Sequence, residues 1–313
     1  MFKSARIRIL VTLCNNQKRH ESNLYTKYRV DVIRPPKTHK STLIWLHGSG
    51  QTSSDFRARL STIATENTKV VIPNAPYRYV ESRGLVQSWA TVSTLERMGD
   101  IPDPKVPEKR MEDEGSLEGS RDAIISLITY EHNILNTVKS GGLEGLAAAF
   151  SGALSAPMEL TKKAQIFLAG YDTGGALAIY AGLTHPMIKL AGLCSISGYV
   201  PNKKHLVKSI PYFQRNQRLL ALNGMLDEFV DVNYAEEGYK ELKDKAGMGN
   251  VFVTIDPSRD NIIEDREWMQ LTETVNKTFK GNISASKAQK VTSLRSMISR
   301  STSSKSMGDV NWK

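Results

Sequence analysis

Apolar runs alternate with amphipathic segments from about residue 28 to residue 280, and this alternation predicts a parallel sheet with helices on both faces. Residues 28–34 alternate polar and apolar positions, as an edge strand does, whereas the later runs are continuously apolar, as strands buried on two faces are. The segments with strand character are residues 28–34, 41–46, 69–73, 164–169, 190–196, 218–222 and 251–255. The segments with helical character are residues 55–65, 112–138, 174–184, 234–245 and 266–279. The sequence therefore predicts an α/β protein with a mostly parallel central sheet.

The rest of the chain divides into two ends and two interruptions. Residues 1–27 form a basic N-terminal extension, and residues 281–313, with nine serines, form a Ser/Lys/Arg-rich tail that we expect to be disordered. The predicted domain of residues 28–280 is interrupted by a Pro-rich, charged loop at about 94–110 and by a Gly/Ala/Ser-rich stretch at about 141–157. The second interruption is either a surface insertion or a short helix that packs as a lid. The N-terminal extension is either a frayed basic end or a mitochondrial presequence, because its first twenty residues hold five basic side chains and no acidic one.

The formal net charge of +10 belongs to the ends of the chain. Residues 1–40 carry +8 and residues 281–313 carry +5, which leaves −3 for the residues between them. A slightly acidic domain is not built to bind nucleic acid, so we expect no nucleic-acid partner. No apolar run approaches the ~18 residues of a membrane-spanning helix, so we expect no transmembrane segment. The two cysteines, Cys14 and Cys194, have no partner at CxxC or metal-ligand spacing, which indicates reduced thiols and a cytoplasmic protein.

Residues 166–180 have the pattern of a nucleophile elbow with an aspartate in place of the serine. The sequence IFLAGYDTGGALAIY places Asp172 between a hydrophobic strand and a helix, with Gly170 and Gly174 two residues away on either side. In a GxSxG elbow the glycines make room for a strained turn that lifts one side chain above the sheet at a helix N-terminus. The GxDxG string is therefore expected to hold Asp172 at the top of such a turn.

Further motifs in the same order resemble the acyl-protein thioesterase and phospholipase/carboxylesterase family, and within it the lysophospholipase-like branch. LIWLHGSG at 43–50 resembles the family's LHGxG loop, and IPNAPYR at 72–78, followed by SW at 88–89, resembles its P-x-AP-x-R segment. EDEG at 112–115, SRD at 120–122 and LAGLCSISGY at 190–199 resemble other motifs of the family. The resemblance extends over about residues 41–280. It implies an α/β-hydrolase fold and the hydrolysis of esters or thioesters by serine, aspartate and histidine, with no cofactor.

When the resemblance is carried over to this chain, the family's three catalytic positions fall on aspartates. NGMLDEFV at 223–230 resembles HGxxDxxV, which makes Asp227 the expected triad acid. Asp172 stands at the nucleophile position, and VTIDPSRD at 253–260 places Asp260 about where the histidine belongs. None of the six histidines follows Asp227, so no imidazole is available there as a general base near neutral pH. An aspartate with an ordinary pKa of about 4 is a poor replacement.

The resemblance also implies an oxyanion hole. The backbone N–H groups of Ser49 and Thr173 are the expected donors, and Asp172 places beside them a carboxylate that can already satisfy them. The residues expected at the pocket are His47, Gly48 and Trp89. His47 is expected to support the backbone of its loop, and its alternative role is that of a substitute base. Asp172 could also be a nucleophile, as in the haloalkane dehalogenase and epoxide hydrolase branches of this fold, but those enzymes still use a histidine to activate water.

A shared pocket for Asp172, Asp227 and Asp260 would raise their pKa values, unless a cation or a basic side chain neutralises them. One hypothesis is a hard divalent cation held by these oxygen ligands. The other, which we favour, is that Arg259, the helix N-terminus at Gly174 and solvent absorb the charge, so that no metal is bound.

The sequence therefore predicts a catalytically impaired or inactive relative of the thioesterases that binds an acyl-ester or S-acylated protein ligand. One alternative is an active carboxylesterase or palmitoyl-protein thioesterase with a non-standard site. Another is an interaction protein whose basic tail binds anionic membranes.

Overall fold

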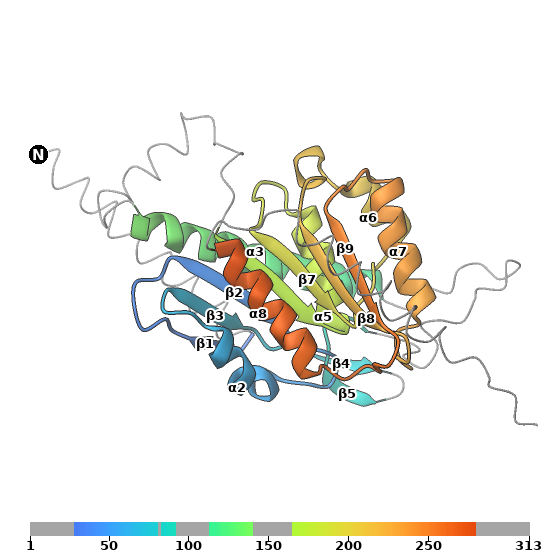
Figure 1. Cartoon of the computed structure of the whole chain (residues 1–313), viewed down its shortest axis with the longest axis horizontal. Coiled ribbons are helices and arrows are strands. Elements are labelled where there is room, and N and C mark those ends of the chain that lie inside the picture. Colours follow the sequence, from blue (N-terminus) through green and yellow to red (C-terminus); the bar gives the residue numbers. More distant parts are fainter. Residues whose placement is uncertain (1–27, 81–82, 92–112, 140–164, 280–313) are drawn as a thin grey trace, which may run out of the picture.

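The computed structural model describes residues 28–80, 83–91, 113–139 and 165–279, which are built around one large sheet (Figure 1). The expected N-terminal extension, both expected insertions and the expected C-terminal tail lie outside these residues. Within the described residues, no helix combines the length and the apolar character needed to cross a membrane.

The large sheet has seven strands, of which six are parallel. Its strands, in spatial order, are β1 (Asp31–Ile33), β3 (Thr68–Ile72), β2 (Ser41–Leu46), β6 (Ile166–Tyr171), β7 (Gly192–Ile196), β8 (Leu219–Gly224) and β9 (Val251–Asp256). Strand β1 lies at the edge and pairs antiparallel with β3, and every other neighbouring pair is parallel. This arrangement confirms the mostly parallel sheet that the apolar runs predicted.

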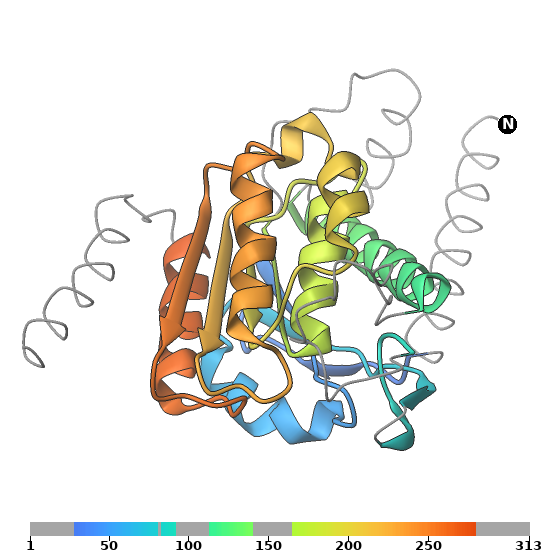
Figure 2. The same ribbon diagram turned by 90° about the vertical axis from the view of Figure 1, so that its right-hand side faces the viewer.

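Helices cover both faces of the sheet (Figure 2). The helices whose apolar side chains join the core on one face are α3 (Glu114–Lys139), α5 (Thr173–Thr184), α6 (Lys203–Ser209) and α7 (Val232–Asp244). Those of the other face are α2 (Ser53–Ile63) and α8 (Asp265–Phe279). Strand β2 shows why two cores form: Ile44 and Leu46 belong to the first, whereas Leu43 and Trp45 belong to the second, because successive side chains point to opposite faces.

A two-stranded hairpin stands apart from the large sheet. Its strands, β4 (Tyr77–Val80) and β5 (Gly84–Gln87), pair antiparallel, and the carbonyl oxygen of Gln87 accepts a hydrogen bond from Gly50 N at 2.8 Å. The apolar pattern did not predict this hairpin, nor helix α6, nor the 3₁₀ turn Tyr212–Gln214.

The parallel order determines where the site lies. Strands β2, β6, β8 and β9 run in the same direction, so the segments that follow them meet at the carboxyl edge of the sheet. These segments contain the LHGSG loop, the elbow and the two loops that hold Asp227 and Asp260.

Candidate active site

Asp172 occupies a strained turn between β6 and α5. Its backbone angles are φ 53° and ψ −125°, a conformation that residues other than glycine rarely adopt. Two glycines allow the turn to close. A Cβ atom added to Gly170 would lie 2.3 Å from the carbonyl oxygen of Gly174, and one added to Gly174 would lie 2.3 Å from that of Leu46. The chain therefore retains the elbow geometry although the serine is absent.

The carboxylate of Asp172 faces the two backbone N–H groups that were expected to form an oxyanion hole. The N–H of Ser49 donates to Oδ2 across 3.1 Å, and the N–H of Thr173 also favours the charged carboxylate. Asp172 is 6% exposed, and no partner for its Oδ1 is found among the described residues. Burial raises the pKa of Asp172 to about 6, against the opposing effect of the two N–H groups and of Arg83. Both expected donors therefore already serve an anion that belongs to the chain itself.

His47 supports the loop that carries Ser49. Its Nε2 atom accepts a hydrogen bond from the N–H of Ala75 at 2.9 Å, and its Nδ1 donates to the carbonyl oxygen of Gly48 at 2.8 Å. Burial lowers the pKa of His47 to about 4, so the ring is neutral at pH 7. Since backbone groups use both ring nitrogens, neither is free to act as a general base on a ligand.

Trp89 and Gln51 complete this support. The indole N–H of Trp89 donates to the carbonyl oxygen of His47 at 2.8 Å, and Oε1 of Gln51 accepts from the N–H of Gly48 at 3.0 Å. His47 and Trp89 are both fully buried. The two side chains thus lie beneath the loop, which differs from the expectation that they line a pocket, because side chains without exposed surface have no contact with a ligand. Gly48 is next to the elbow, since a Cβ there would be 3.2 Å from Cβ of Asp172.

Asp227 lies in the loop after β8 and is held by the backbone of that loop. Its Oδ1 atom accepts hydrogen bonds from the N–H groups of Phe229 and Val230, both at 2.9 Å. Burial raises the pKa of Asp227, although these hydrogen bonds oppose the effect. The charge of Asp227 in turn raises the pKa of Asp172, so the structure brings these two expected site residues close together.

Asn261, rather than Asp260, contacts the carboxylate of Asp227. The Nδ2 atom of Asn261 lies 3.4 Å from Oδ1 and 3.5 Å from Oδ2 of Asp227. Asp260 is exposed, and its Oδ1 accepts a hydrogen bond from the N–H of Ile262 at 2.7 Å. This differs from the expectation that Asp260 stands at the histidine position, because its side chain closes its own turn.

The charges of the three expected site aspartates all act on the Tyr171 hydroxyl, but the three carboxylates are not placed to share a metal ion. Within the ranges that the structure describes, no group of three or more His, Cys, Asp or Glu side chains is placed to hold a metal ion. The cation hypothesis required all three carboxylates, and Asp260 faces solvent instead.

Arg83, in the hairpin, is a site residue that the sequence motifs did not reveal. Its guanidinium donates to the carbonyl oxygen of Ser49 at 2.6 Å and lies over the ring of Phe229, 5.2 Å from the centroid. Its positive charge lowers the pKa of Asp172. Arg83 therefore connects the loop after β2 with the loop that holds Asp227, and only the folded hairpin brings it there.

The other described histidines do not supply the missing imidazole. His39 precedes β2 and His185 follows α5, so both lie at the end of the sheet opposite to Asp172. His132 is close enough to His185 to lower its pKa, and it therefore belongs to that end as well. His205 is exposed on α6.

Comparison with known proteins shows the family of this chain. Residues 28–279 match the sequence profile of the phospholipase/carboxylesterase family. The acyl-protein thioesterase 1 homolog 1 of Dictyostelium discoideum is 23% identical over 223 residues, which cover 70% of this chain and 82% of the relative. Acyl-protein thioesterase 1 of Mycosarcoma maydis is 26% identical over 227 residues, covering 70% of this chain and 83% of the relative.

A solved structure shows the same architecture. The crystal structure of Zea mays acyl-protein thioesterase 2 superposes with a TM-score of 0.60 at 20% identity, covering 80% of this chain and 99% of that chain. This likeness confirms the α/β-hydrolase fold that the motifs implied. Because the matched profile spans the central sheet, the elbow and the loops after β8 and β9, this chain belongs to the phospholipase/carboxylesterase family.

Proposed function

We propose that this chain is a catalytically impaired member of the family that binds acyl-ester or S-acylated protein ligands without hydrolysing them. The proposal rests chiefly on the contact between Asp172 and Ser49. In acyl transfer, N–H groups at this place stabilise the negative oxygen that develops on the substrate. Here they bind a carboxylate already, and a second negative charge beside it is repelled.

The proton chemistry supports the same conclusion. Hydrolysis in the manner of this family needs a base that takes a proton from the nucleophile and returns it to the leaving group. The carboxylate of Asp227 meets the amide of Asn261, and a carboxamide does not accept protons near neutral pH. His47 is neutral, but backbone groups use both of its ring nitrogens.

One observation favours the alternative of an active enzyme with Asp172 as its nucleophile. Oδ1 of Asp172 is buried but has no hydrogen-bond partner among the described residues, so no hydrogen bond to the chain would have to break before it attacked a carbonyl carbon that reaches it. Attack on a thioester would expel the thiolate and leave a mixed anhydride on Asp172. Water would have to cleave that anhydride without help from any imidazole of the described residues, so we expect such an adduct to accumulate rather than turn over.

The names of the relatives support the proposed ligand class. Two of the similar proteins are named acyl-protein thioesterases, which supports an S-acylated protein as the ligand. A cytoplasmic location is part of the proposal, and it is supported by Cys194, a buried cysteine with a free thiol.

Binding and cleavage can be measured on the same peptide. The full chain would be mixed with a fluorescent S-palmitoylated peptide, and with the same peptide unacylated as the control. We expect higher fluorescence anisotropy with the acylated peptide, and mass spectrometry should show an intact thioester and an unmodified protein. Equal binding of both peptides would contradict the binding role. Thioester cleavage that Asp172→Ala abolishes, or an acyl adduct on Asp172, would support the active alternative.

A further inference from the structure

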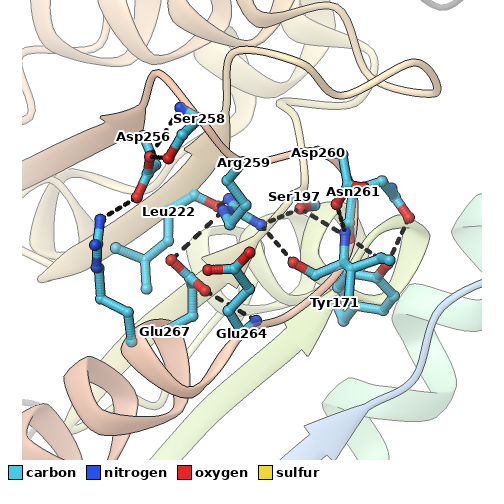
Figure 3. Close-up of polar contacts among 12 residues, drawn as sticks. Tyr171, Ser197, Leu222, Asp256, Ser258, Arg259, Asp260, Asn261, Glu264 and Glu267 are labelled. Atoms are coloured by element: carbon cyan, nitrogen blue, oxygen red, sulfur yellow. Dashed lines mark hydrogen bonds and ion pairs between the residues drawn. The ribbon is translucent and has the colours of Figure 1, made fainter.

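Asn261 joins the ends of two strands through its side chain. Its Nδ2 donates toward the carboxylate of Asp227 after β8, at 3.4 and 3.5 Å. Its Oδ1 accepts the hydroxyl proton of Tyr171, the last residue of β6, at 2.5 Å. The same hydroxyl also contacts the carbonyl oxygen of Asn261 (Figure 3). The residue before the elbow and the expected triad acid are thus connected through one carboxamide.

We infer that Asn261 stands at the position from which a histidine would serve this site, an inference that rests on the proposed function. A triad histidine donates its Nδ1–H to the acid and turns its Nε2 toward the nucleophile. The amide N–H of Asn261 makes the corresponding contact with Asp227, but a carboxamide ends there and carries no second, basic nitrogen. Asn261 therefore keeps the hydrogen bond to the triad acid but cannot transfer a proton to or from a nucleophile.

The loop after β9 is fixed in this register by a buried arginine. Arg259 is 1% exposed, and its guanidinium donates to Oγ of Ser197 at 2.9 Å and to the carbonyl oxygen of Leu222 at 3.0 Å. Its Nε lies 3.5 Å from a carboxylate oxygen of Glu267, which is also buried. Figure 3 shows this cluster beside Asn261 and Tyr171.

The loop backbone is equally constrained. The N–H of Leu226 donates to the carbonyl oxygen of Arg259 at 2.9 Å. A Cβ atom on Gly224 would lie only 2.2 Å from that same oxygen, so the two loops are packed in direct backbone contact. Because the side chain of Arg259 points into the core, the side chain of Asp260 points to solvent. The side chain of Asn261 then points inward again and contacts Asp227.

Two double variants test the inference. Asp172→Ser is combined either with Asn261→His or, as the matched control, with Asp260→His, and Asp172→Ser alone is the reference. A fluorophosphonate probe reports an activated serine: the serine oxygen bonds to phosphorus, fluoride leaves, and the hydroxyl proton passes to the base. We expect Asp172→Ser with Asn261→His to label at position 172 on the order of 100-fold faster than the reference, since a general base typically contributes that much or more.

The dependence of labelling on pH separates a base from a structural effect. The labelling rate of this variant should fall as the pH drops through about 6.5, the ordinary pKa of histidine. Adding Asp227→Asn should remove the gain. The assignment of Asn261 to the histidine position would be overturned if Asp172→Ser with Asp260→His labelled faster than Asp172→Ser with Asn261→His. Equal labelling rates in these two proteins and in Asp172→Ser alone would overturn it as well. Turnover by the unmodified chain would instead count against the proposed function, so the two failures are distinguishable.

A second measurement does not depend on how the double variants fold. The amide of Asn261 lowers the pKa of Asp227, so Asn261→Ala should raise that pKa in a carboxyl carbon NMR titration. Asp260→Ala should leave it unchanged. The reverse result would show that Asp260 is the partner of Asp227.

Discussion

The N–H of Ser49 points at Oδ2 of Asp172 across 3.1 Å, so the loop after β2 and the elbow after β6 are joined by the side chain that replaces the serine. In a working esterase site of this kind, that N–H remains free for the oxygen of the substrate. The same contact therefore stabilises the fold locally and, under the proposed function, opposes catalysis. It also leaves a buried carboxylate whose charge has measurable consequences.

The buried charge of Asp172 should make the protein less stable as the pH rises. Burial raises the pKa of Asp172 from its ordinary 3.8 to about 6, so the folded chain holds this proton more tightly than the unfolded chain does. Between these two values the unfolded chain has released a proton that the folded chain keeps, and the free energy of unfolding falls with increasing pH. The contribution is fully present below pH 3.8 and is lost by about pH 7, a change of about 3 kcal/mol.

Asp172→Asn isolates this contribution, because asparagine does not titrate and tolerates a positive φ. Urea denaturation of both proteins should show the variant gaining about 2 kcal/mol relative to the natural chain between pH 4 and pH 7. A difference that stays constant over this range would contradict a raised pKa for Asp172.

The ring of His47 should remain unprotonated from pH 8 to pH 5. Burial lowers its pKa to about 4, and the accepting Nε2 is occupied by the N–H of Ala75. A nitrogen-15 NMR titration of the imidazoles is therefore expected to show a flat His47 signal over this interval. If that signal titrated near pH 7, a candidate base would exist close to the elbow, and the support role of His47 would be wrong.

Two glycine substitutions should act in opposite directions. Gly174→Ala forces a methyl group against the carbonyl oxygen of Leu46, and we expect it to lower the free energy of unfolding by about 3 kcal/mol. Gly119→Ala, in α3, meets no atom within 4 Å and should raise it by about 0.5–1 kcal/mol. Chemical denaturation of the two variants checks both signs. A neutral effect of Gly174→Ala would mean that the elbow is less crowded than the structure indicates.

The ion pair between Arg259 and Glu267 should be important for stability. Both side chains are buried, so Glu267→Gln removes the ion-pair partner of the guanidinium and leaves it only the more distant charges of Asp227 and Asp256, and we expect a loss of about 3 kcal/mol. The exposed pair between Lys37 and Glu66 is the control, since Glu66→Gln should change stability by less than about 1 kcal/mol. Similar losses in both variants would contradict the structural role given to Arg259.

The central sheet was predictable because its strands carry unusually clear signals. Residues 43–46 form a continuous apolar run after Ser41 and Thr42, and the structure places all six residues in β2 with both faces buried. Strands β4 and β5 gave no such signal: each has four residues, and Tyr77, Tyr79 and Leu85 are largely exposed. Their position depends on packing against the loop at Gly50, which no local pattern records.

The site was predictable only to the extent that motifs fix spacing. The family resemblance implied that Asp172 lies beside the N–H groups of Ser49 and Thr173, and in the structure the N–H of Ser49 donates to its carboxylate. The sequence motif placed Asp260 at the histidine position, one residue before Asn261, which contacts Asp227. The motif could not fix this register, because tertiary contacts determine which side chains of a loop turn inward. Here burial of Arg259 determines that Asn261 reaches Asp227. Arg83 escaped notice for the same reason, since it comes from the hairpin.

The rate of p-nitrophenyl butyrate hydrolysis by the full chain, compared with that of Asp172→Ala under identical conditions, tests the central claim most directly. An oxyanion hole filled by Asp172 and the lack of a usable imidazole among the described residues predict equal rates for both proteins, neither above the rate in buffer. Saturable turnover by the natural chain that disappears in Asp172→Ala would contradict the account.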